Sequence, residues 1–313
     1  MRKSLQLQAE MSEEFGTCVF DVTLDCEDGA PVGGEADHAA LVVALVALAS
    51  DRARVAVRVH ALDHPAFEAD IASIAGKVGH RLSHVMVPKV ESVADVDRVV
   101  AALAAVSQLE LPVHVLLESP AAVHRAFEIA AHPRVQSLSF GLMDFVSSHG
   151  GAIPADGMSS HGQFTHPLVV RAKLEIASAC HAHGKVPSHN VVTEFQDAAA
   201  LSHAAHQAAR ELGYTRMWSI HPYQIRPILA AFAPSEGAVE IATRIVLAAE
   251  NADWAPISFQ GQLHDRASVR YHWQVLLRAN QIGHSLPPEA RAWFDPGDVA
   301  SPVYSPPSPE TTR

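Results

Sequence analysis

Short apolar runs of strand length alternate along the chain with longer alanine-rich stretches whose apolar residues recur with a helical period. This alternation is typical of βαβ units, which build a parallel sheet covered by helices. Eight of the runs are predicted strands, at 4–8, 18–24, 54–59, 83–87, 113–117, 136–140, 185–191 and 216–220. Eight is the number of strands in a (β/α)8 barrel. The sequence therefore predicts an α/β fold, a TIM barrel, with a doubly wound open sheet as the alternative.

The intervals between the strands predict six helices, at 38–49, 66–78, 93–106, 121–131, 167–183 and 198–212. A catalytic barrel is thus predicted over 1–232, ending near the Pro-Ser boundary in FAPS. We expect 233–300 to form a C-terminal helical extension or lid that contributes to a neighbouring active site, and the Pro-rich and Ser-rich residues 301–313 to form a flexible tail. The interval 146–165, rich in Gly, Ser, His and Pro, is predicted to be a lid or binding loop.

The composition argues against several classes of function. The net charge is −11 and the pI about 6.0, so no basic surface is predicted that would favour nucleic acid or an anionic membrane. Three cysteines stand far apart, without the spacing of a disulfide framework or a zinc site. The first residues lack the apolar core of a secretory signal, and the longest apolar run, AALVVALVALA, is too short to span a membrane. We expect a cytoplasmic protein.

Charged and polar side chains gather where the predicted strands end. Helix capping and surface ion pairs explain such residues taken singly. In a parallel barrel, however, the carboxyl ends of all strands meet at one face, and that face carries the catalytic residues. The candidates are Asp25, Glu27, Asp28, Arg58, His60, Lys89, Glu91, Glu118, Asp144, Ser188, His189, Asn190, His221 and Gln224.

Two of these candidates, Glu118 and Asp144, are carboxylates at the ends of strand-like runs. Mg²⁺ prefers oxygen ligands and often takes only one or two protein carboxylates, with water and substrate completing the octahedron. The sequence therefore predicts a metal site for Mg²⁺ or Mn²⁺ on this pair. The alternative is that both carboxylates form ion pairs with Arg58 or Lys89. No HExxH, GxGxxG or GxxxxGK(S/T) motif indicates a zinc or nucleotide site instead.

A series of motifs in this order resembles the citrate lyase beta subunit family, which includes malyl-CoA and citramalyl-CoA lyases and belongs to the HpcH/HpaI aldolase superfamily. LDCEDG corresponds to the family's LDLEDAV-like motif, RVH to VRVN, VPKVES to PKVES, and FGLMDF to FGxxDL. LLESPAAVHRAFEIA matches the start of the family's Glu-Thr-rich helix, and SIHPYQI with FAPS matches IHPxQI and FxPS. The resemblance covers nearly the whole chain.

The resemblance implies a Mg²⁺-dependent lyase that cleaves or forms a 3-hydroxyacyl thioester with a 2-oxo acid such as oxaloacetate or glyoxylate. Members of the family place their metal on the residues that correspond to Glu118 and Asp144, and their substrate-binding arginine corresponds to Arg58. A late aspartate of the family acts at the active site of a neighbouring subunit, and QGQLHD puts Asp265 at that position. We therefore expect a homo-oligomer, a trimer or hexamer, and allow for the other subunits of a lyase complex as partners.

The remaining expected site residues surround the metal pair and the thioester. Glu27 and Asp28 are expected to hold metal-bound waters as outer ligands. Contacts with the acid or with coenzyme A are expected from Arg58, Lys89, His189, Asn190, His221, Pro222 and Gln224. The cofactor would thus be Mg²⁺, and a CoA thioester would be the substrate.

The chain also departs from the family pattern. RKSLQLQAE replaces the family's RSxLFVPG, which leaves Arg2 or Lys3 as the candidate for its basic residue, and the lysine after the acidic motif is absent from PVGGEADHAA. SHN stands where relatives have Ile-Asp. Two alternatives therefore stay open: an HpaI-type aldolase that acts on free hydroxy acids, and a non-catalytic subunit that binds CoA or an acid.

Overall fold

The structure, a computed structural model, describes residues 1–194 and 196–294 and divides them into two units. The first unit comprises Met1–Glu14 and Phe20–Phe232, and the second comprises Phe15–Val19 and the described residues from Ala233 onward. Each unit is described by itself. The predicted tail at 301–313 lies outside the described residues.

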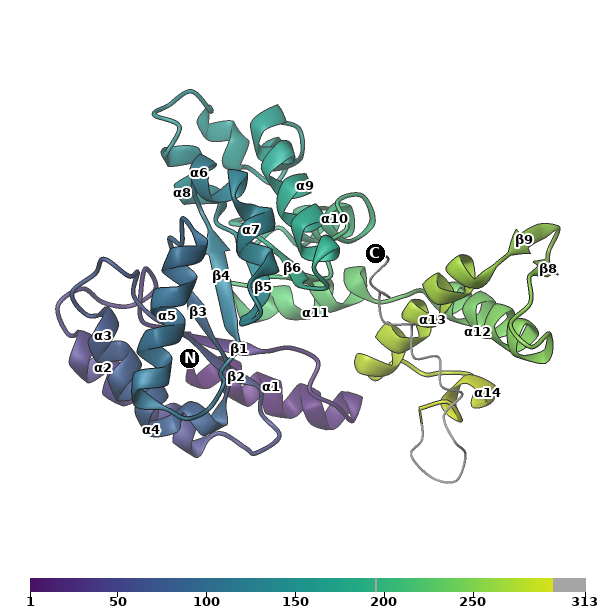
Figure 1. The fold of residues 1–313 in the computed structure, drawn as a ribbon, viewed down its shortest axis with the longest axis horizontal. Helices are drawn as coiled ribbons and strands as arrows, with labels where there is room; N and C mark the ends of the chain where they lie inside the picture. The colour runs from purple at the N-terminus through teal and green to yellow at the C-terminus, as the bar shows by residue number, and fades with distance from the viewer. Residues whose placement is uncertain (195, 295–313) are drawn as a thin grey trace, which may run out of the picture. The chain divides into compact units, whose positions relative to one another are not determined.

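A parallel sheet of seven strands forms the centre of the first unit (Figure 1). Its strands are β1 (Val22–Asp25), β2 (Val55–Arg58), β3 (Leu82–Val87), β4 (Val113–Leu117), β5 (Val135–Phe140), β6 (Val186–His189) and β7 (Arg216–Met217). They lie side by side in the order of the sequence. A doubly wound sheet reverses its strand order part-way, so the sequential order rules out that alternative.

The sheet is curled, because residues from its two ends contact each other. A guanidinium nitrogen of Arg216, in β7, lies 3.5 Å from a carboxylate oxygen of Asp21, just before β1. The guanidinium of Arg58, at the end of β2, lies 5.4 Å from the ring centroid of Trp218, just after β7. The α/β fold is therefore confirmed as a curled, barrel-like parallel sheet of seven strands in the described residues.

The predicted first strand, at 4–8, is wrong. These residues lie inside helix α1 (Arg2–Phe15). The alternation of Leu5 and Leu7 indicated a strand, but Leu, Gln, Ala, Met and Glu in this segment all favour helix. Gln8 and Met11 are buried on one face of the helix, and the Gln8 amide donates to the carbonyls of Phe20 and Arg54 at 2.7 and 2.9 Å.

Helices follow the strands and cover the outer face of the sheet (Figure 1). The remaining helices of this unit are α2 (Glu35–Leu48), α3 (Phe67–Asp70), a π-helical turn (Ile71–Ala75), α4 (Gly76–Val78), a 3-10 turn (Gly79–Arg81), α5 (Val93–Val106), α6 (Pro120–His124), α7 (Ala126–Ala131), α8 (Leu142–Ser147), 3-10 turns at Ala155–Met158 and Gly162–Phe164, α9 (Pro167–Ala182), α10 (Ala198–Arg210) and α11 (Pro222–Phe232). All six predicted helices are confirmed with small shifts at their ends, but two are interrupted: 66–78 contains the π-helical turn, and 121–131 is divided into α6 and α7 at Arg125.

Alternation along the strands decides which residues reach the inside of the curled sheet. Val55 and Val57 of β2, like Val115 and Leu117 of β4, belong to the apolar core shared with the helices. Successive side chains of a strand point to opposite faces. Arg58 therefore points inward at the end of β2, and the same alternation directs other polar residues into the interior at the strand ends.

The second unit contains helices and one hairpin. Its elements are α12 (Glu236–Asn251), β8 (Ile257–Phe259), β9 (Gln262–His264), α13 (Arg266–Gln281) and α14 (Pro288–Arg291). β8 and β9 pair antiparallel. Apolar residues of α12 and α13, among them Ile245 and Leu276, form a separate core. No helix within residues 1–194 and 196–294 is both long and apolar enough to cross a membrane.

Candidate active site

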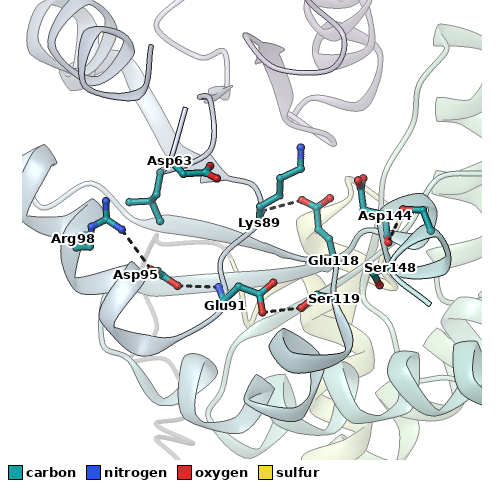
Figure 2. A pocket seen from close by; sticks show the side chains of 11 residues that line it. Asp63, Lys89, Glu91, Asp95, Arg98, Glu118, Ser119, Asp144 and Ser148 are labelled. Atoms are coloured by element: carbon teal, nitrogen blue, oxygen red, sulfur yellow. Dashed lines mark hydrogen bonds and ion pairs between the residues drawn. The ribbon is translucent and has the colours of Figure 1, made fainter. Parts of the chain in front are cut away.

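A cavity of about 530 Å³ opens in the first unit at the carboxyl ends of β3, β4 and β5 (Figure 2). This is the edge at which parallel barrels carry their active sites. The cavity is lined mainly by polar side chains: Leu62, Asp63, Lys89, Glu91, Asp95, Arg98, Glu118, Ser119, Asp144, Ser147 and Ser148. The structure thus brings the two predicted metal ligands, Glu118 and Asp144, together in one cavity.

Glu118 and Asp144 follow the neighbouring strands β4 and β5 and interact with each other in this cavity (Figure 2). Glu118 follows β4 directly, and Asp144 lies in the first turn of α8, four residues beyond β5. Gly141 makes room between them, because a Cβ at that position would lie only 2.6 Å from the Cγ of Glu118. The backbone N–H of Lys89 donates to Glu118 at 3.0 Å.

No cationic side chain among the described residues pairs with Glu118 or Asp144. The Lys89 ammonium binds Glu27 at 2.8 Å instead, and Arg58 binds Asp25 and Glu27. The predicted alternative, an ion pair of the two carboxylates with Arg58 or Lys89, is therefore wrong. The two neighbouring carboxylates thus have no cationic partner within residues 1–194 and 196–294.

Burial, with the neighbouring Asp144 carboxylate as the second cause, raises the pKa of Glu118 to about 8. Such a pair gains from a divalent cation, which neutralises both groups. Nowhere in the described residues do three or more His, Cys, Asp or Glu side chains form a metal site. Two carboxylates with water and substrate nevertheless suffice for Mg²⁺, so the residues present fit a magnesium ion.

Arg58 is held by acidic residues at the end of β1. Its Nε and Nη2 donate to the two carboxylate oxygens of Asp25 at 2.7 and 2.5 Å, and its Nη1 lies 2.8 Å from Glu27 and 3.9 Å from Asp28. Asp25 and Arg58 are partners in the strand register. Burial alone would raise the pKa of Asp25, but the hydrogen bond and charge of Arg58 outweigh it and lower that pKa. The guanidinium is thus fixed in one orientation.

Glu27 joins Arg58 to Lys89. Its side chain is nearly buried and contacts Arg58 with one oxygen and the Lys89 ammonium with the other. The hydrogen bond to Glu27 is the main cause that raises the pKa of Lys89. Lys89 has a φ of 54°, a backbone conformation rare outside glycine, which aims its N–H at Glu118 while its side chain reaches Glu27. Asp28 is largely exposed, and its role as an outer ligand stays a prediction.

His189 and Asn190 are buried and do not line the cavity. The Asn190 amide donates to Gln163 at 2.9 Å, and the fully buried Lys173 ammonium donates to the same Gln163 oxygen at 2.8 Å. The His189 ring stacks on Phe164, with centroids 5.4 Å apart. In this geometry the two residues attach the loop after Asp144 to the end of β6, and their contact with substrate stays a prediction.

The IHPYQI segment contains both buried and partly exposed residues. Gln224 is buried, and its amide accepts from the N–H of Ile220 at 2.9 Å and donates to the carbonyl of Val192 at 2.8 Å. Its hydrogen bonds are made inside the protein, so Gln224 shapes the turn before α11. His221 and Pro222, in that turn, are only partly buried. Their contact with coenzyme A stays a prediction.

Asp265, the predicted acid-base group, belongs to the second unit and begins α13 as its N-cap. Its carboxylate accepts from the N–H groups of Ala267 and Ser268, both at 3.0 Å. These hydrogen bonds, first that of Ser268, lower the pKa of Asp265. The side chain is an exposed carboxylate, and its action at a neighbouring active site stays a prediction.

Three contacts were not predicted from the sequence. Asp25 was a candidate in the acidic motif, but its pairing with Arg58 depends on the strand register. Trp218 stacks near Arg58 from the opposite end of the sheet, and no local pattern indicates that contact. Asp70, which binds His60 at 2.6 Å, lies within a helical stretch where an acidic residue is ordinarily exposed.

The comparisons with known proteins agree with this geometry. Residues 5–222 match the family described as HpcH/HpaI aldolase/citrate lyase. The L-malyl-CoA/beta-methylmalyl-CoA lyase of Cereibacter sphaeroides is 31% identical over 291 residues, which cover 86% of this chain and 91% of that protein.

Two solved structures are similar over most of the chain. A citrate lyase from Burkholderia xenovorans has a TM-score of 0.81 and 48% identity, covering 94% of this chain and 92% of its own. The protein CitE from Mycobacterium tuberculosis, in complex with magnesium, acetoacetate and coenzyme A, has a TM-score of 0.64 and 27% identity, covering 83% and 90%. As its motifs predict, the chain belongs to the HpcH/HpaI aldolase/citrate lyase family and is a lyase.

Proposed function

We propose that the protein is a Mg²⁺-dependent carbon-carbon lyase that cleaves or forms a 3-hydroxyacyl-CoA thioester and releases or consumes a 2-oxo acid such as oxaloacetate or glyoxylate. The observation that carries the proposal is the pair Glu118 and Asp144, which lies in a polar cavity and forms no ion pair with a cationic side chain of the described residues. Relatives named as malyl-CoA lyase and a similar structure with magnesium, acetoacetate and coenzyme A support the same chemistry.

Glu118 and Asp144 would hold the metal through one oxygen each or more, with water and the 2-oxo acid as the other ligands. When bound, magnesium polarises the keto group and acts as a template for the adjacent carboxylate. Glu27 and Asp28 would bind the metal's waters, and Lys89 would keep Glu118 oriented through its N–H, which lies 3.0 Å from that carboxylate.

Arg58 would stabilise the negative charge that develops on the enolate, or bind a substrate carboxylate. A guanidinium has five N–H donors, and two of those of Arg58 donate to Asp25, while Glu27 forms an ion pair with the same group. Other N–H groups therefore remain for the substrate. Because the acidic partners fix the guanidinium beforehand, its orientation need not change as charge develops.

Asp265 of a neighbouring protomer would take the proton from the acyl carbon in the direction of condensation. Its lowered pKa, caused first by the Ser268 N–H, keeps it a carboxylate near neutral pH, the form that a base requires. This role requires a homo-oligomer, which we propose to be a trimer or a hexamer. The substrate would include coenzyme A next to His221 and Pro222, in the turn that Gln224 holds. We also propose a cytoplasmic location, because the three cysteines stand far apart in the sequence, without the spacing of a disulfide framework.

Calorimetric titration with Mg²⁺ tests the metal site. We expect Glu118→Ala and Asp144→Ala each to abolish measurable binding. Asp63→Ala is the matched control, because Asp63 lines the same cavity but is an exposed carboxylate of the loop after β2. Unchanged Mg²⁺ binding in the first two variants would contradict the metal assignment.

A substrate screen tests the thioester. The unchanged protein is assayed with malyl-CoA, citramalyl-CoA and citryl-CoA beside the corresponding free hydroxy acids, with release of the 2-oxo acid as the readout. We expect turnover of a thioester and none of the free acids. Turnover of free acids alone would favour an aldolase of the HpaI type, and binding without turnover would favour a non-catalytic subunit.

A further inference from the structure

Two serine side chains line the cavity close to the proposed metal ligand Asp144 (Figure 2). Ser147 and Ser148 come three and four residues after Asp144, at the end of α8, and both are exposed. Residues three and four apart in a helix are neighbours on one face, with Cβ atoms about 5–6 Å apart. A 2-oxo acid held at Glu118 and Asp144 would therefore lie beside these two hydroxyl groups.

The hydroxyl protons of the two serines can turn toward a ligand at little cost. Ser147 donates to the carbonyl of Asp144 at 3.0 Å, and Ser148 donates to the carbonyl of Phe145 at 2.8 Å. Each carbonyl also accepts a second hydrogen bond. Asp144 accepts from the N–H of Ser148 at 2.8 Å, and Phe145 accepts from Nδ1 of His149 at 2.6 Å. Both carbonyls thus keep a partner when the hydroxyls rotate.

The cavity offers no apolar side chain next to Asp144. Of the described residues that line it, Leu62 is the single apolar one, and it belongs to the loop after β2. Asp144 and the two serines follow β5, and β3 and β4 lie between β2 and β5 in the sheet. A methyl group beside Asp144 would find no apolar partner on this wall, whereas a group that accepts hydrogen bonds would meet two donors.

The charges in the cavity increase the importance of these donors. Carboxylates predominate among the lining residues, and the Lys89 ammonium is already bound to Glu27 at 2.8 Å. An anionic substituent of the substrate beside Asp144 would depend on the serine hydroxyls. Hydrogen bonds to a charged acceptor are stronger than those between neutral groups. Two hydroxyls at this place therefore favour a carboxylate over an apolar group.

We propose that Ser147 and Ser148 determine which 2-oxo acid the lyase releases or consumes. They favour an acid that carries a carboxymethyl group, as oxaloacetate does, over one that carries a methyl group or a hydrogen atom, as pyruvate and glyoxylate do. The inference rests on the proposed function and adds the residues that select the substituent. The two hydroxyls contact this substituent and not the keto group, so the bonds that form and break are unchanged.

A comparison of three thioesters tests the selection. Citryl-CoA, citramalyl-CoA and malyl-CoA carry the three substituents, and release of the 2-oxo acid is the readout. We expect the unchanged protein to have its highest kcat/KM with citryl-CoA. The double variant Ser147→Ala/Ser148→Ala should lose at least about 10-fold in kcat/KM for citryl-CoA, because it removes both donors to a charged group. Its kcat/KM for citramalyl-CoA should stay within about threefold.

Calorimetry gives a second readout that needs no turnover. With Mg²⁺ present, the double variant should bind oxaloacetate at least about 10-fold more weakly than the unchanged protein. Its affinities for pyruvate and for Mg²⁺ should be unchanged. Ser202→Ala is the matched control, because Ser202 is an exposed helical serine outside the cavity whose hydroxyl donates to the carbonyl of Ala198 at 2.8 Å. It should behave as the unchanged protein in both assays.

The outcomes separate this inference from the function on which it rests. Equal losses for the three thioesters in the double variant, or no loss for citryl-CoA, would overturn the inference and leave the lyase intact. A higher kcat/KM of the unchanged protein for citramalyl-CoA or malyl-CoA than for citryl-CoA would do the same. Absence of thioester cleavage by the unchanged protein would overturn the proposed function and this inference together.

Discussion

The strands of the seven-stranded sheet carry polar residues at both ends, which we call the amino-terminal and the carboxyl-terminal edge. The acidic residues at the two edges differ in whether a cationic side chain pairs with them. At the amino-terminal edge, Asp21 lies 2.6 Å from Arg54 and 3.5 Å from Arg216. At the carboxyl-terminal edge, Glu118 and Asp144 meet without a cation from the described residues. The acid at the amino-terminal edge is paired with arginines and stabilises the fold. The acids at the carboxyl-terminal edge have no such partner, and this is the edge at which parallel barrels bind their ligands.

Two histidines, in β3 and β4, are also buried near the amino-terminal edge. His84 and His114 are almost fully buried, and their rings lie 5.3 Å apart. Burial lowers the pKa of His84 to about 4 and that of His114 well below its ordinary value. Both are therefore neutral at physiological pH. His114 is satisfied by Ser139, whose hydroxyl lies 2.7 Å from Nε2.

The largest expected effect is the difference in kcat between two variants, each of which replaces one acid by its amide: Glu118→Gln at the carboxyl-terminal edge and Asp21→Asn at the amino-terminal edge. Glu118→Gln removes a ligand of the proposed metal, whose polarisation of the substrate contributes several kcal/mol, so we expect kcat to fall at least about 1,000-fold. Asp21→Asn should leave kcat within about threefold. Steady-state assays at saturating Mg²⁺ check both values, and comparable losses in the two variants would contradict the assignment of function to one edge.

Acid should weaken the protein through the amino-terminal edge. An unfolded histidine takes its proton near pH 6.5, whereas folded His84 resists it down to about pH 4. Stability from neutral His84 is therefore complete above pH 6.5 and is lost as the pH falls toward 4, by about 3 kcal/mol in all.

Chemical denaturation at intervals between pH 7 and 4 measures this loss. His84→Leu cannot take a proton, so its free energy of unfolding should depend less on pH over the same range. His64→Gln, which changes an exposed histidine, serves as the control and should keep the slope of the unchanged protein. An equal slope in His84→Leu would show that another group causes the acid sensitivity.

The same two acid variants should shift stability in opposite directions. Asp21→Asn leaves Arg54 and Arg216 without their charged partner, and we expect the free energy of unfolding to fall by about 1–3 kcal/mol. The pKa of Glu118 is raised to about 8, so the two adjacent carboxylates are both charged only above that pH. There we expect Glu118→Gln to raise the free energy of unfolding of the metal-free protein by about 0.5–2 kcal/mol. Denaturant unfolding in the presence of a chelator checks both signs. A loss of stability in Glu118→Gln would mean that its carboxylate is satisfied within the fold.

The sequence predicted the parts of the fold that depend on local pattern. Seven of the eight strands and the helices between them follow from apolar periodicity, which burial imposes on every element of a barrel. The segment at 4–8 failed because five residues with two alternating leucines fit either period. The helix-favouring residues of 2–15 and the contacts of Gln8 with the carbonyls of Phe20 and Arg54 distinguish the helix.

Site residues that are marked by their position at the end of a strand could be predicted from the sequence. Contacts that depend on the register between two strands could not. Glu118 ends an apolar run, and the motifs that surround it resemble those of a known family. It could therefore be predicted as a metal ligand from the sequence alone. Which acid would bind Arg58 was not readable, because Asp25, Glu27 and Asp28 are near neighbours in sequence. The strand register and the inward direction of Asp25 decide that question, and both are properties of the assembled sheet.

The smallest effect should come from crowding the acidic pair without changing its chemistry. Gly141→Ala adds a Cβ that would lie 2.6 Å from the Cγ of Glu118, so that side chain must shift. We expect the affinity for Mg²⁺ to fall about 10-fold, which is about 1.4 kcal/mol. Gly76→Ala is the matched control, since its Cβ would lie 3.5 Å from Val106, an ordinary contact within a helical region. Calorimetry should show unchanged binding for Gly76→Ala. Equal affinities for Mg²⁺ in Gly141→Ala and Gly76→Ala would mean that the orientation of Glu118 does not affect metal binding. The negative charge of the two carboxylates, and not their geometry, would then determine the affinity.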